Sequence, residues 1–360
     1  MHELNFTSAL YLGFTHPSDA LPAWRQLTTG VPAVLGSPSI ADDVAAAAAR
    51  LIGAADAVVA PSTLHVALDL IPMLAPPGTT MFFDAGVYPI SHWGIERAVT
   101  NGARAVSFRA HDPRALRDTL ALHAPFARPP LVVCDGLCPS CGRLAPLRSY
   151  ETVVRSHGGR IVVDDTQAIG ILGRRPNTEY PYGCGGGGTT RLLDVPMDGV
   201  VVFASLAKGF GAPLAIVAGP ERVIQRFREN ADTRAHCSPP SIPVLLAAQR
   251  ALALNASHGD LLRRRLFDRV AHFRRRFAHT GLLTSTTHFP VQPLRVARPE
   301  HARLIQRSLR NHGVRAPLTR DHDGSPLVTF VLTAAHTVRA IDAAAALTLS
   351  LLTGTLRRAG

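Results

Sequence analysis

The chain has 360 residues, of which 46% are hydrophobic and 18% are charged, and its formal net charge is +12. This composition excludes a disordered chain, and the length predicts one large and one small domain. The sequence has no apolar stretch of about 18 residues and no signal-peptide pattern, so we expect no membrane span and a cytoplasmic protein. Its arginines are spread out with few aromatic residues between them, so no nucleic-acid binding is expected.

The first two thirds of the chain alternate between short apolar runs and amphipathic patterns. Runs such as "RIVVDD" have the length and β-branched content of buried strands, and apolar residues recur at helical spacing between them. This alternation predicts an α/β fold with a mostly parallel sheet covered by helices on both faces. The predicted strands are 57–60, 80–84, 104–108, 130–135, 160–165, 199–205 and 214–219. The predicted helices include 39–54, 112–124 and 149–158.

The pattern changes after about residue 255. A smaller α+β domain is expected there, because helices and short strands no longer alternate regularly. Its predicted elements are an arginine-rich helix (258–279), a strand (290–296), a helix (299–312), a strand (326–332) and a final helix from His336. We therefore predict an N-terminal arm (1–38), a large domain (39–255) and a small domain (256–360). The glycine-rich run at 183–188 is expected to be a flexible loop.

Lys208, in "FASLAKGFGAPLAIVAG", is the only lysine, so 37 of the 38 basic side chains are arginine. Such a composition suggests a coding bias that replaced lysine by arginine wherever only a positive charge was needed. The one remaining lysine would then be retained for its chemistry. An amine can lose its proton and attack a carbonyl, whereas a guanidinium cannot. The expected chemistry is a Schiff base with a carbonyl substrate or with pyridoxal phosphate (PLP). The plainer interpretation is a solvated surface lysine.

Asp164 and Ser205 each stand at the end of a predicted strand, where ligands bind to parallel sheets. A carboxylate leaving the sheet at Asp164 could pair with a protonated pyridine nitrogen, although a capping or metal-binding aspartate is the alternative. Ser205 precedes Lys208 by three residues, and Gly209 and Gly211 follow. A serine and a tight glycine turn beside the lysine suit a bound phosphate.

Ser62 and Thr63 follow another predicted strand and begin a helix. Hydroxyl and backbone N–H groups at such a position can bind an anion, and an ordinary helix cap is the alternative. Tyr88 lies just past the strand at 80–84 and could stack on a flat cofactor. A tyrosine packed in a loop would have the same sequence.

The order of these motifs resembles the α-oxoamine synthases, PLP-dependent enzymes of the aspartate aminotransferase fold (fold type I). The resemblance covers almost the whole chain. It rests on "LNFTSALYLGFTHP" (4–17), "DGLCPSCGRLAPL" (135–147), "VVDDTQAIGILG" (162–173), "SLAKGFG" (205–211), "HCSPPS" (236–241) and "LTAAHT" (332–337). The lysine and aspartate motifs are the most specific of these.

The resemblance implies a role for each candidate residue around PLP. Lys208 would bind PLP through a Schiff base and later move protons, and Asp164 would pair with the pyridine nitrogen. Tyr88 falls where the family places a stacking histidine. The phosphate would be held by Ser205, Ser62 and Thr63. The catalytic residues expected on this basis are Lys208, Asp164 and Gln167.

The resemblance also implies the reaction and the partners. Family members that transfer acyl groups condense an amino-acid-derived carbanion with an acyl thioester, carried by coenzyme A or a carrier protein. They are homodimers with shared active sites, and residues 236–241 match a segment that reaches the neighbouring subunit. We expect such an acyltransferase in a specialised biosynthetic pathway. The alternatives are an aminotransferase or decarboxylase acting on an unusual amine donor, and a non-catalytic carrier or partner-binding protein.

Two positions depart from the family pattern. Gln167 replaces a histidine that contacts the cofactor ring, and glutamine does not exchange a proton near neutrality. Leu327 and Thr329 stand where an arginine would bind the substrate carboxylate. Either Arg315 or Arg320 substitutes for it, or the amino substrate has no carboxylate at the usual place.

Cysteines at 134, 138 and 141 form a Cys-x3-Cys-x2-Cys pattern. This spacing can hold an iron–sulfur cluster, and a zinc site is a further alternative. Because the pattern overlaps a stretch that already matches the PLP family, we expect pocket-lining thiols and no metal.

Overall fold

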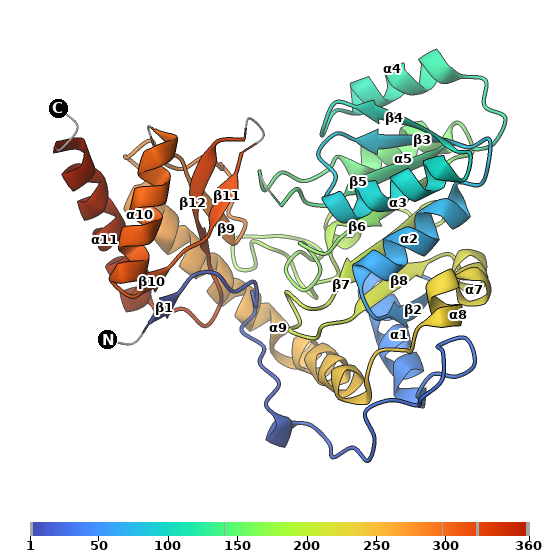
Figure 1. Cartoon of the computed structure of the whole chain (residues 1–360), viewed down its shortest axis with the longest axis horizontal. Coiled ribbons are helices and arrows are strands. Elements are labelled where there is room, and N and C mark those ends of the chain that lie inside the picture. Colours follow the sequence, from blue (N-terminus) through green and yellow to red (C-terminus); the bar gives the residue numbers. More distant parts are fainter. Residues whose placement is uncertain (1–2, 140, 297, 322–323, 358–360) are drawn as a thin grey trace.

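The structure is a computed structural model that describes residues 3–139, 141–296, 298–321 and 324–357. Its largest element is a seven-stranded sheet with helices packed around it, and a smaller sheet lies at the other end of the molecule (Figure 1). In sheet order the strands are β2 (Asp56–Ala60), β8 (Ala215–Gly219), β7 (Val200–Ser205), β6 (Arg160–Asp164), β5 (Leu131–Asp135), β3 (Thr80–Asp84) and β4 (Arg104–Phe108). Every predicted strand of the large sheet is therefore present.

The sheet is mostly parallel, as predicted, and β8 is the exception. It pairs antiparallel with both of its neighbours, β7 and β2. Residues 206–214 join β7 to β8, and this connection is too short for the crossover of a dozen or more residues that a parallel return needs. Lys208 lies on this short connection.

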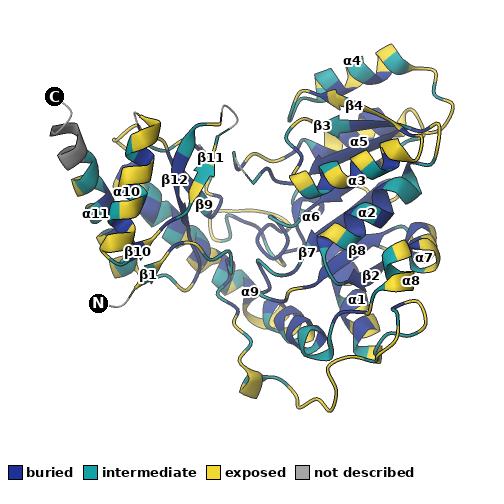
Figure 2. Ribbon diagram, in the orientation of Figure 1, coloured by how far each residue is buried: buried dark blue, intermediate teal, exposed yellow. Residues whose placement is uncertain are grey.

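Both faces of the large sheet are buried except at its edge strand β4, where only Phe108 is buried. Along β5, Leu131 and Val133 belong to one apolar cluster, and Val132 and Cys134 belong to the other. Because successive side chains of a strand point to opposite faces, a sheet covered on both sides has nearly continuous apolar strands. Figure 2 shows these strands as buried, except the edge strand β4, and the outer faces of the surrounding helices as exposed.

The helices around the large sheet follow its strands along the chain. Ser62 caps α2, and Asp112 caps α4 by accepting hydrogen bonds from Arg114 N and Ala115 N, so both helices begin at side-chain caps. The helices are α1 (Ser39–Ile52), α2 (Thr63–Leu74), α3 (Pro89–Thr100), α4 (Pro113–His123), α5 (Leu147–Arg155), α6 (Thr189–Leu192), α7 (Glu221–Asn230), α8 (Asp232–His236) and α9 (Ile242–Phe277).

The C-terminal part contains an antiparallel sheet with helices beside it. It consists of β11 (Leu318–Arg320), β12 (Pro326–Val331) and β9 (Val291–Leu294), with α10 (Pro299–Asn311) and α11 (Val338–Arg357). The N-terminal segment returns to this part of the molecule, where β1 (Leu4–Asn5) pairs in parallel with β10 (Val314–Arg315). A short 3-10 helix, η1 (Ser18–Ala20), lies farther along that segment.

Helix α9 joins the two parts and packs against both α1 and α11 (Figure 1). The helix expected over 258–279 begins instead at Ile242, after Ser241 and with Pro243 in its first turn. No further proline interrupts the chain between Pro243 and Phe277, so it continues as one helix. The predicted domain boundary between residues 255 and 256 falls inside α9, and the division of the chain at 38 and 255 stays a prediction.

The glycine-rich run at 183–188 is packed, although the sequence suggested a flexible loop. Its last three glycines are buried, and Gly170 N donates to Gly186 O at 2.8 Å. A Cβ atom on Gly188 would lie 1.8 Å from Asp165 Oδ2, and one on Gly183 would lie 2.2 Å from Gly173 O. Glycine is therefore needed at these positions because neighbouring atoms come too close for a side chain. The sequence alone could not distinguish this reason from a need for a flexible backbone.

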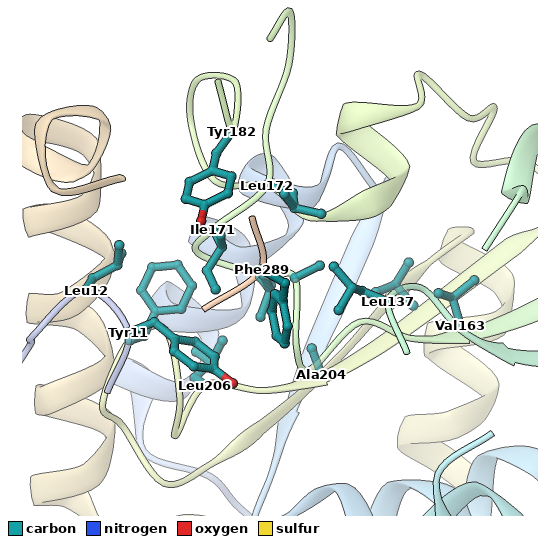
Figure 3. Packing of buried hydrophobic residues seen from close by; sticks show 14 of the residues in the cluster. Tyr11, Leu12, Leu137, Val163, Ile171, Leu172, Tyr182, Ala204, Leu206 and Phe289 are labelled. Atoms are coloured by element: carbon teal, nitrogen blue, oxygen red, sulfur yellow. The ribbon is translucent and has the colours of Figure 1, made fainter. Parts of the chain in front are cut away.

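An apolar cluster joins the two sheets beneath the predicted site. Tyr11 from the N-terminal segment packs edge-on against Phe289 from the C-terminal part, with ring centres 5.8 Å apart. Figure 3 shows both rings beside Leu206, with Leu137 near Phe289. The N-terminal segment is therefore part of the core. No helix within the described residues is long and apolar enough to cross a membrane.

We expect Gly94→Ala to destabilise the protein, because α2 and α3 cross at this residue. A Cβ atom there would lie 2.4 Å from Ala67 O and 2.8 Å from Ile71 Cδ1. Relieving such a contact costs about 1–3 kcal/mol, and thermal unfolding followed by circular dichroism would show a lower midpoint. Gly199→Ala is the matched control, since its nearest neighbour would be at 3.8 Å. Equal midpoints for the two variants would contradict the crossing geometry.

Candidate active site

A cavity of about 160 Å³ lies at the carboxyl ends of β5, β6 and β7. Ligands bind at this edge of parallel sheets, because the loops that follow the strands converge there. The cavity is lined by Thr63, Tyr88, Ile90, Asp135, Leu137, Pro139, Asp164, Thr166, Gln167, Ser205 and Lys208. It thus brings together every site residue predicted from the sequence except Ser62, which lies next to Thr63.

Lys208 reaches the cavity from the tight connection between β7 and β8. Leu206 N donates to Leu214 O at 2.9 Å, which closes the connection, and Gly211 has a φ of +63°. Gly209 packs so closely that a Cβ atom would lie 2.6 Å from Ile169 O. Burial lowers the pKa of Lys208, and the carboxylates of Asp164 and Asp135 act in the opposite direction.

Asp164 is the last residue of β6 and is buried. Its Oδ1 accepts a hydrogen bond from Thr166 N at 2.9 Å. Burial raises its pKa, while Thr166 and the Lys208 charge partly offset this effect. Asp165 is turned away from the cavity and accepts from Thr189 N at 2.8 Å and Thr189 Oγ1 at 2.6 Å; burial raises its pKa to about 6. Two adjacent aspartates therefore serve different tasks.

Asp135 is a site residue that the sequence reasoning missed. It ends β5 directly beside Asp164, and burial together with the Asp164 charge raises its pKa well above the usual range. Its Oδ2 accepts from Tyr88 N at 3.0 Å, while Oδ1 is buried without a hydrogen-bond partner among the described residues. The position at the end of a predicted strand, which singled out Asp164, could also have identified Asp135.

The hydroxyl groups predicted to hold an anion have different surroundings. Ser62 caps α2, accepting from His65 N at 3.4 Å, and its Oγ lies 2.7 Å from His65 Nδ1. Thr63 begins α2 and lines the cavity. Ser205 Oγ accepts from Ala207 N at 3.2 Å, while Ser205 N donates to Thr166 Oγ1 at 3.0 Å. The side chain of Thr166 is a further cavity residue that the sequence did not single out.

Tyr88 and Gln167 differ in how firmly they are held. Tyr88 precedes α3, and its side chain is 44% exposed. The amide of Gln167 is oriented by Tyr11, whose hydroxyl donates to Gln167 Oε1 at 2.8 Å. Tyr11 is buried, which raises the pKa of its hydroxyl, so it stays a donor. This partner lies 156 residues away in the sequence and could not be inferred from spacing.

A second cavity of about 360 Å³ shares Tyr88 and Pro139 with the first and contains Arg320. Arg315, the other arginine suggested by the sequence, forms an ion pair with Glu3 at the molecular surface. Leu327 and Thr329, where an arginine was expected, are buried. Of the two candidate arginines, Arg320 is the one beside the site.

A larger cavity of about 1120 Å³ lies elsewhere, mainly between α1 and α9. It contains four arginines but none of the predicted site residues, and it is away from the strand ends. The lysine, the buried carboxylates and the convergent hydroxyls all belong to the smaller cavity. We therefore assign the candidate active site to the smaller cavity by its chemistry rather than by size.

Comparison with known proteins identifies the family of the chain. The family model for aminotransferase class I and II matches residues 2–337. An 8-amino-7-oxononanoate synthase from Acidithiobacillus ferrooxidans is 30% identical over 346 residues, which is 92% of this chain and 84% of the relative. Another, from Alcanivorax borkumensis, is 28% identical over 354 residues, covering 94% and 86%. Serine palmitoyltransferase from S. paucimobilis, solved with PLP and myriocin bound as an adduct, superposes with a TM-score of 0.83 at 19% identity, covering 97% of this chain and 87% of that one.

We expect the pKa of Lys208 to lie below that of an ordinary lysine, because burial disfavours the ammonium form. Reductive methylation of cofactor-free protein with ¹³C-labelled formaldehyde marks the only lysine and the N-terminus, so an NMR titration can follow Lys208. Its protonated fraction should fall at lower pH than in a peptide. Asp164→Asn should shift the pKa further down, because a carboxylate that favours the ammonium is lost.

Asp118→Asn is the control for this titration, since Asp118 is exposed on α4, away from the cavity. It should leave the midpoint unchanged. An unshifted Lys208, or a midpoint that rises in Asp164→Asn, would contradict the electrostatic description.

Proposed function

The chain belongs to the aminotransferase class I and II family and, within it, to the α-oxoamine synthases, and on this basis we propose that it condenses an amino-acid-derived carbanion with an acyl thioester. It is a PLP-dependent transferase. The observation that carries the proposal is the position of the only lysine beside a buried strand-end aspartate, in a cavity with convergent hydroxyls. A non-catalytic carrier would need none of these groups.

The residues of the cavity fit PLP. Lys208 offers the amine that binds its aldehyde, and Asp164 offers a carboxylate for the pyridine nitrogen. Asp135 Oδ1 is a buried carboxyl oxygen without a protein partner among the described residues, as expected of an atom that meets a ligand. We assign the phosphate to Ser205 and Thr63, with Ser62 capping the same helix. When bound, PLP withdraws electrons from the substrate and so permits a carbanion to form.

Proton movement falls to Lys208. A lowered pKa leaves more of its amine neutral near pH 7, and a neutral amine can accept a proton from the substrate α-carbon. Gln167 cannot take over this task, because an amide does not titrate near neutrality. Its Oε1 accepts from Tyr11, which leaves Nε2 as the donor for the cofactor ring. We propose that Gln167 orients the cofactor, and that Tyr88 covers one side of it.

We propose that Arg320 binds the carboxylate of the amino substrate. It lies on β11, in a cavity that adjoins the cofactor cavity through Tyr88 and Pro139. Its Nη1 donates to Gly324 O at 3.0 Å, and the side chain is exposed. A guanidinium at this entrance suits a carboxylate, because the pair can form two charge-assisted hydrogen bonds. The family arginine was expected near Leu327 and Thr329 on β12, whereas Arg320 lies on β11. We expect this different position to change which amino acids the protein accepts as substrates.

We also propose that the protein is a cytoplasmic homodimer whose subunits complete each other's sites. The segment before α1 exposes Leu27 (62%) and Leu35 (75%) in the single chain. Backbone hydrogen bonds tie this segment to residues 237–242, from Ala33 N to Cys237 O and from Ile242 N to Leu27 O. Exposed apolar side chains gathered in one segment are typical of an interface. The neighbouring "SPPS" stretch (238–241) would reach the partner's cavity.

The function is tested by thiol release from an acyl thioester. Wild-type protein with PLP, a panel of amino acids and acyl-coenzyme A should release free thiol only when both substrates are present. Lys208→Arg should reduce the rate by about 10³-fold or more, because a guanidinium neither binds PLP covalently nor exchanges protons. Borohydride should attach the cofactor to Lys208 in the wild type, detected by peptide mass spectrometry.

The control for this test is Lys208→Arg combined with Arg222→Lys, which restores one lysine at an exposed position of α7. It should remain inactive. Conversion of the cofactor to pyridoxamine phosphate by an amino acid alone, without thiol release, would establish an aminotransferase instead of an acyltransferase.

We expect Arg320→Met to raise KM for the amino substrate by roughly 10- to 100-fold, the effect of losing hydrogen bonds to a charged group. The KM for the thioester and the absorption of bound cofactor should change little. Arg315→Met is the matched control, an exposed arginine of the same C-terminal part that is paired with Glu3. A larger effect on the thioester KM than on the amino-substrate KM would refute the carboxylate assignment.

A further inference from the structure

We propose that the protein binds a zinc ion between His111, Cys138 and Cys141. One ligand atom from each side chain, the imidazole nitrogen and the two Sγ atoms, lies within 4.8 Å of the others. The Sγ atom of Cys141 is 3.6 Å from Nε2 of His111. Tetrahedral zinc with Zn–S of about 2.3 Å and Zn–N of about 2.0–2.1 Å places these two atoms about 3.6 Å apart. This pair is therefore already spaced for zinc.

The two cysteines belong to a tight turn, which we call the knuckle (residues 138–143, of which Ser140 lies outside the described residues). Cys138 N donates to Arg143 O at 2.9 Å, and Gly142 N donates to Cys138 O at 2.9 Å. Gly142 has a φ of +67°, a conformation that favours glycine. These bonds fold the chain back on itself, so that both thiols point to one place. The Cys-x2-Cys spacing is common in zinc sites.

His111 is held in the orientation that a metal ligand needs. Its backbone N donates to Asp84 Oδ2 at 2.9 Å, and its Nδ1 lies 3.5 Å from the same oxygen. Tyr150 Oη donates to that oxygen as well, at 3.0 Å, which fixes the carboxylate. A carboxylate at Nδ1 directs Nε2 toward the metal and increases its basicity. His111 also has a φ of +59°, a strained value for a non-glycine residue that such contacts maintain.

The ligand set favours zinc over the alternatives. Two thiolates and one imidazole are the soft and borderline donors that zinc prefers over magnesium or calcium. An iron–sulfur cluster held by the sequence pattern would need Cys134, which lies within β5 and is not one of the three clustered residues. None of the five cysteines forms a disulfide. No fourth protein ligand joins the cluster among the described residues, so a water would be the fourth ligand of the proposed zinc.

The position of the site indicates what the zinc would do. It would join the ends of β3, β4 and β5, because Asp84 ends β3, His111 follows β4 and the knuckle follows β5. Residues 137 and 139, on either side of Cys138, line the cofactor cavity. We infer a positioning role in which the ion holds this wall of the active site. The inference does not depend on the proposed reaction.

The test is the metal content of PLP-bound protein, purified without a polyhistidine tag, exposed to zinc and separated from the excess. Wild-type protein should retain about one zinc per chain, and Cys141→Ser or His111→Gln should retain about a tenth of that or less. Cys184→Ser, at a partly buried cysteine outside the cluster, should retain the wild-type amount. Cofactor absorbance of each variant reports whether it has folded.

A cobalt titration of wild-type protein keeps the proposal testable if the variants do not fold. Chelator-treated protein should bind one Co²⁺ with the visible bands of tetrahedral cobalt and a thiolate charge-transfer band, and bound metal should protect the partly exposed Cys141 from alkylation. Wild-type protein without bound metal would overturn the proposal. Equal zinc in the wild type and in the folded variants, or a Cys138–Cys141 disulfide in protein from reducing cells, would do the same.

Discussion

Buried carboxylates at the carboxyl ends of β3, β5 and β6 constrain the architecture of the site. A buried carboxylate is costly unless hydrogen-bond donors or positive charges surround it. Asp84, Asp135, Asp164 and Asp165 each accept a backbone N–H from a loop that follows a strand or a glycine-rich turn. Hydrogen bonds to these four aspartates therefore hold the loops in place. One acceptor atom, Asp135 Oδ1, has no such donor among the described residues, and Asp135 lines the same cavity as Lys208.

The same acidic edge links the proposed PLP chemistry to the proposed zinc site. Asp84 orients His111, and Asp135 holds Tyr88 through its backbone N–H. The segment after β5 contributes cavity residues and the two knuckle cysteines. Zinc at the knuckle would stiffen one wall of the cavity without touching substrate. In this arrangement Lys208 would carry out the proposed chemistry, and the ends of three strands would position the groups around it.

The prediction of strands succeeded because both faces of the large sheet are buried except at β4, which makes the other six strands nearly continuous apolar runs. The motif order singled out Lys208 and Asp164, because each belongs to a short contiguous motif, and the structure places both at one cavity. The prediction of structure was weaker where an element depends on contacts between segments that are far apart in the sequence. The short strands β1 and β10 pair across about 310 residues and have no recognisable periodicity. The sequence suggested that the glycine-rich run is flexible, but the structure shows that Gly183, Gly187 and Gly188 have no room for a Cβ atom, because backbone segments and the Asp165 carboxylate lie against them.

The chain alone was sufficient to establish the α/β class, the mostly parallel sheet, the lysine with its aspartate, and the resemblance to a PLP family. These properties depend on local periodicity, on residue type and on motif order, all of which can be read directly from the sequence. Only the tertiary structure shows that Tyr11 bonds to Gln167, that Arg320 rather than Arg315 lies beside the site, and that His111 lies beside the two knuckle cysteines. Each of these depends on contacts between segments that are far apart in the chain. A local sequence pattern does not indicate which distant side chains become neighbours when the chain folds.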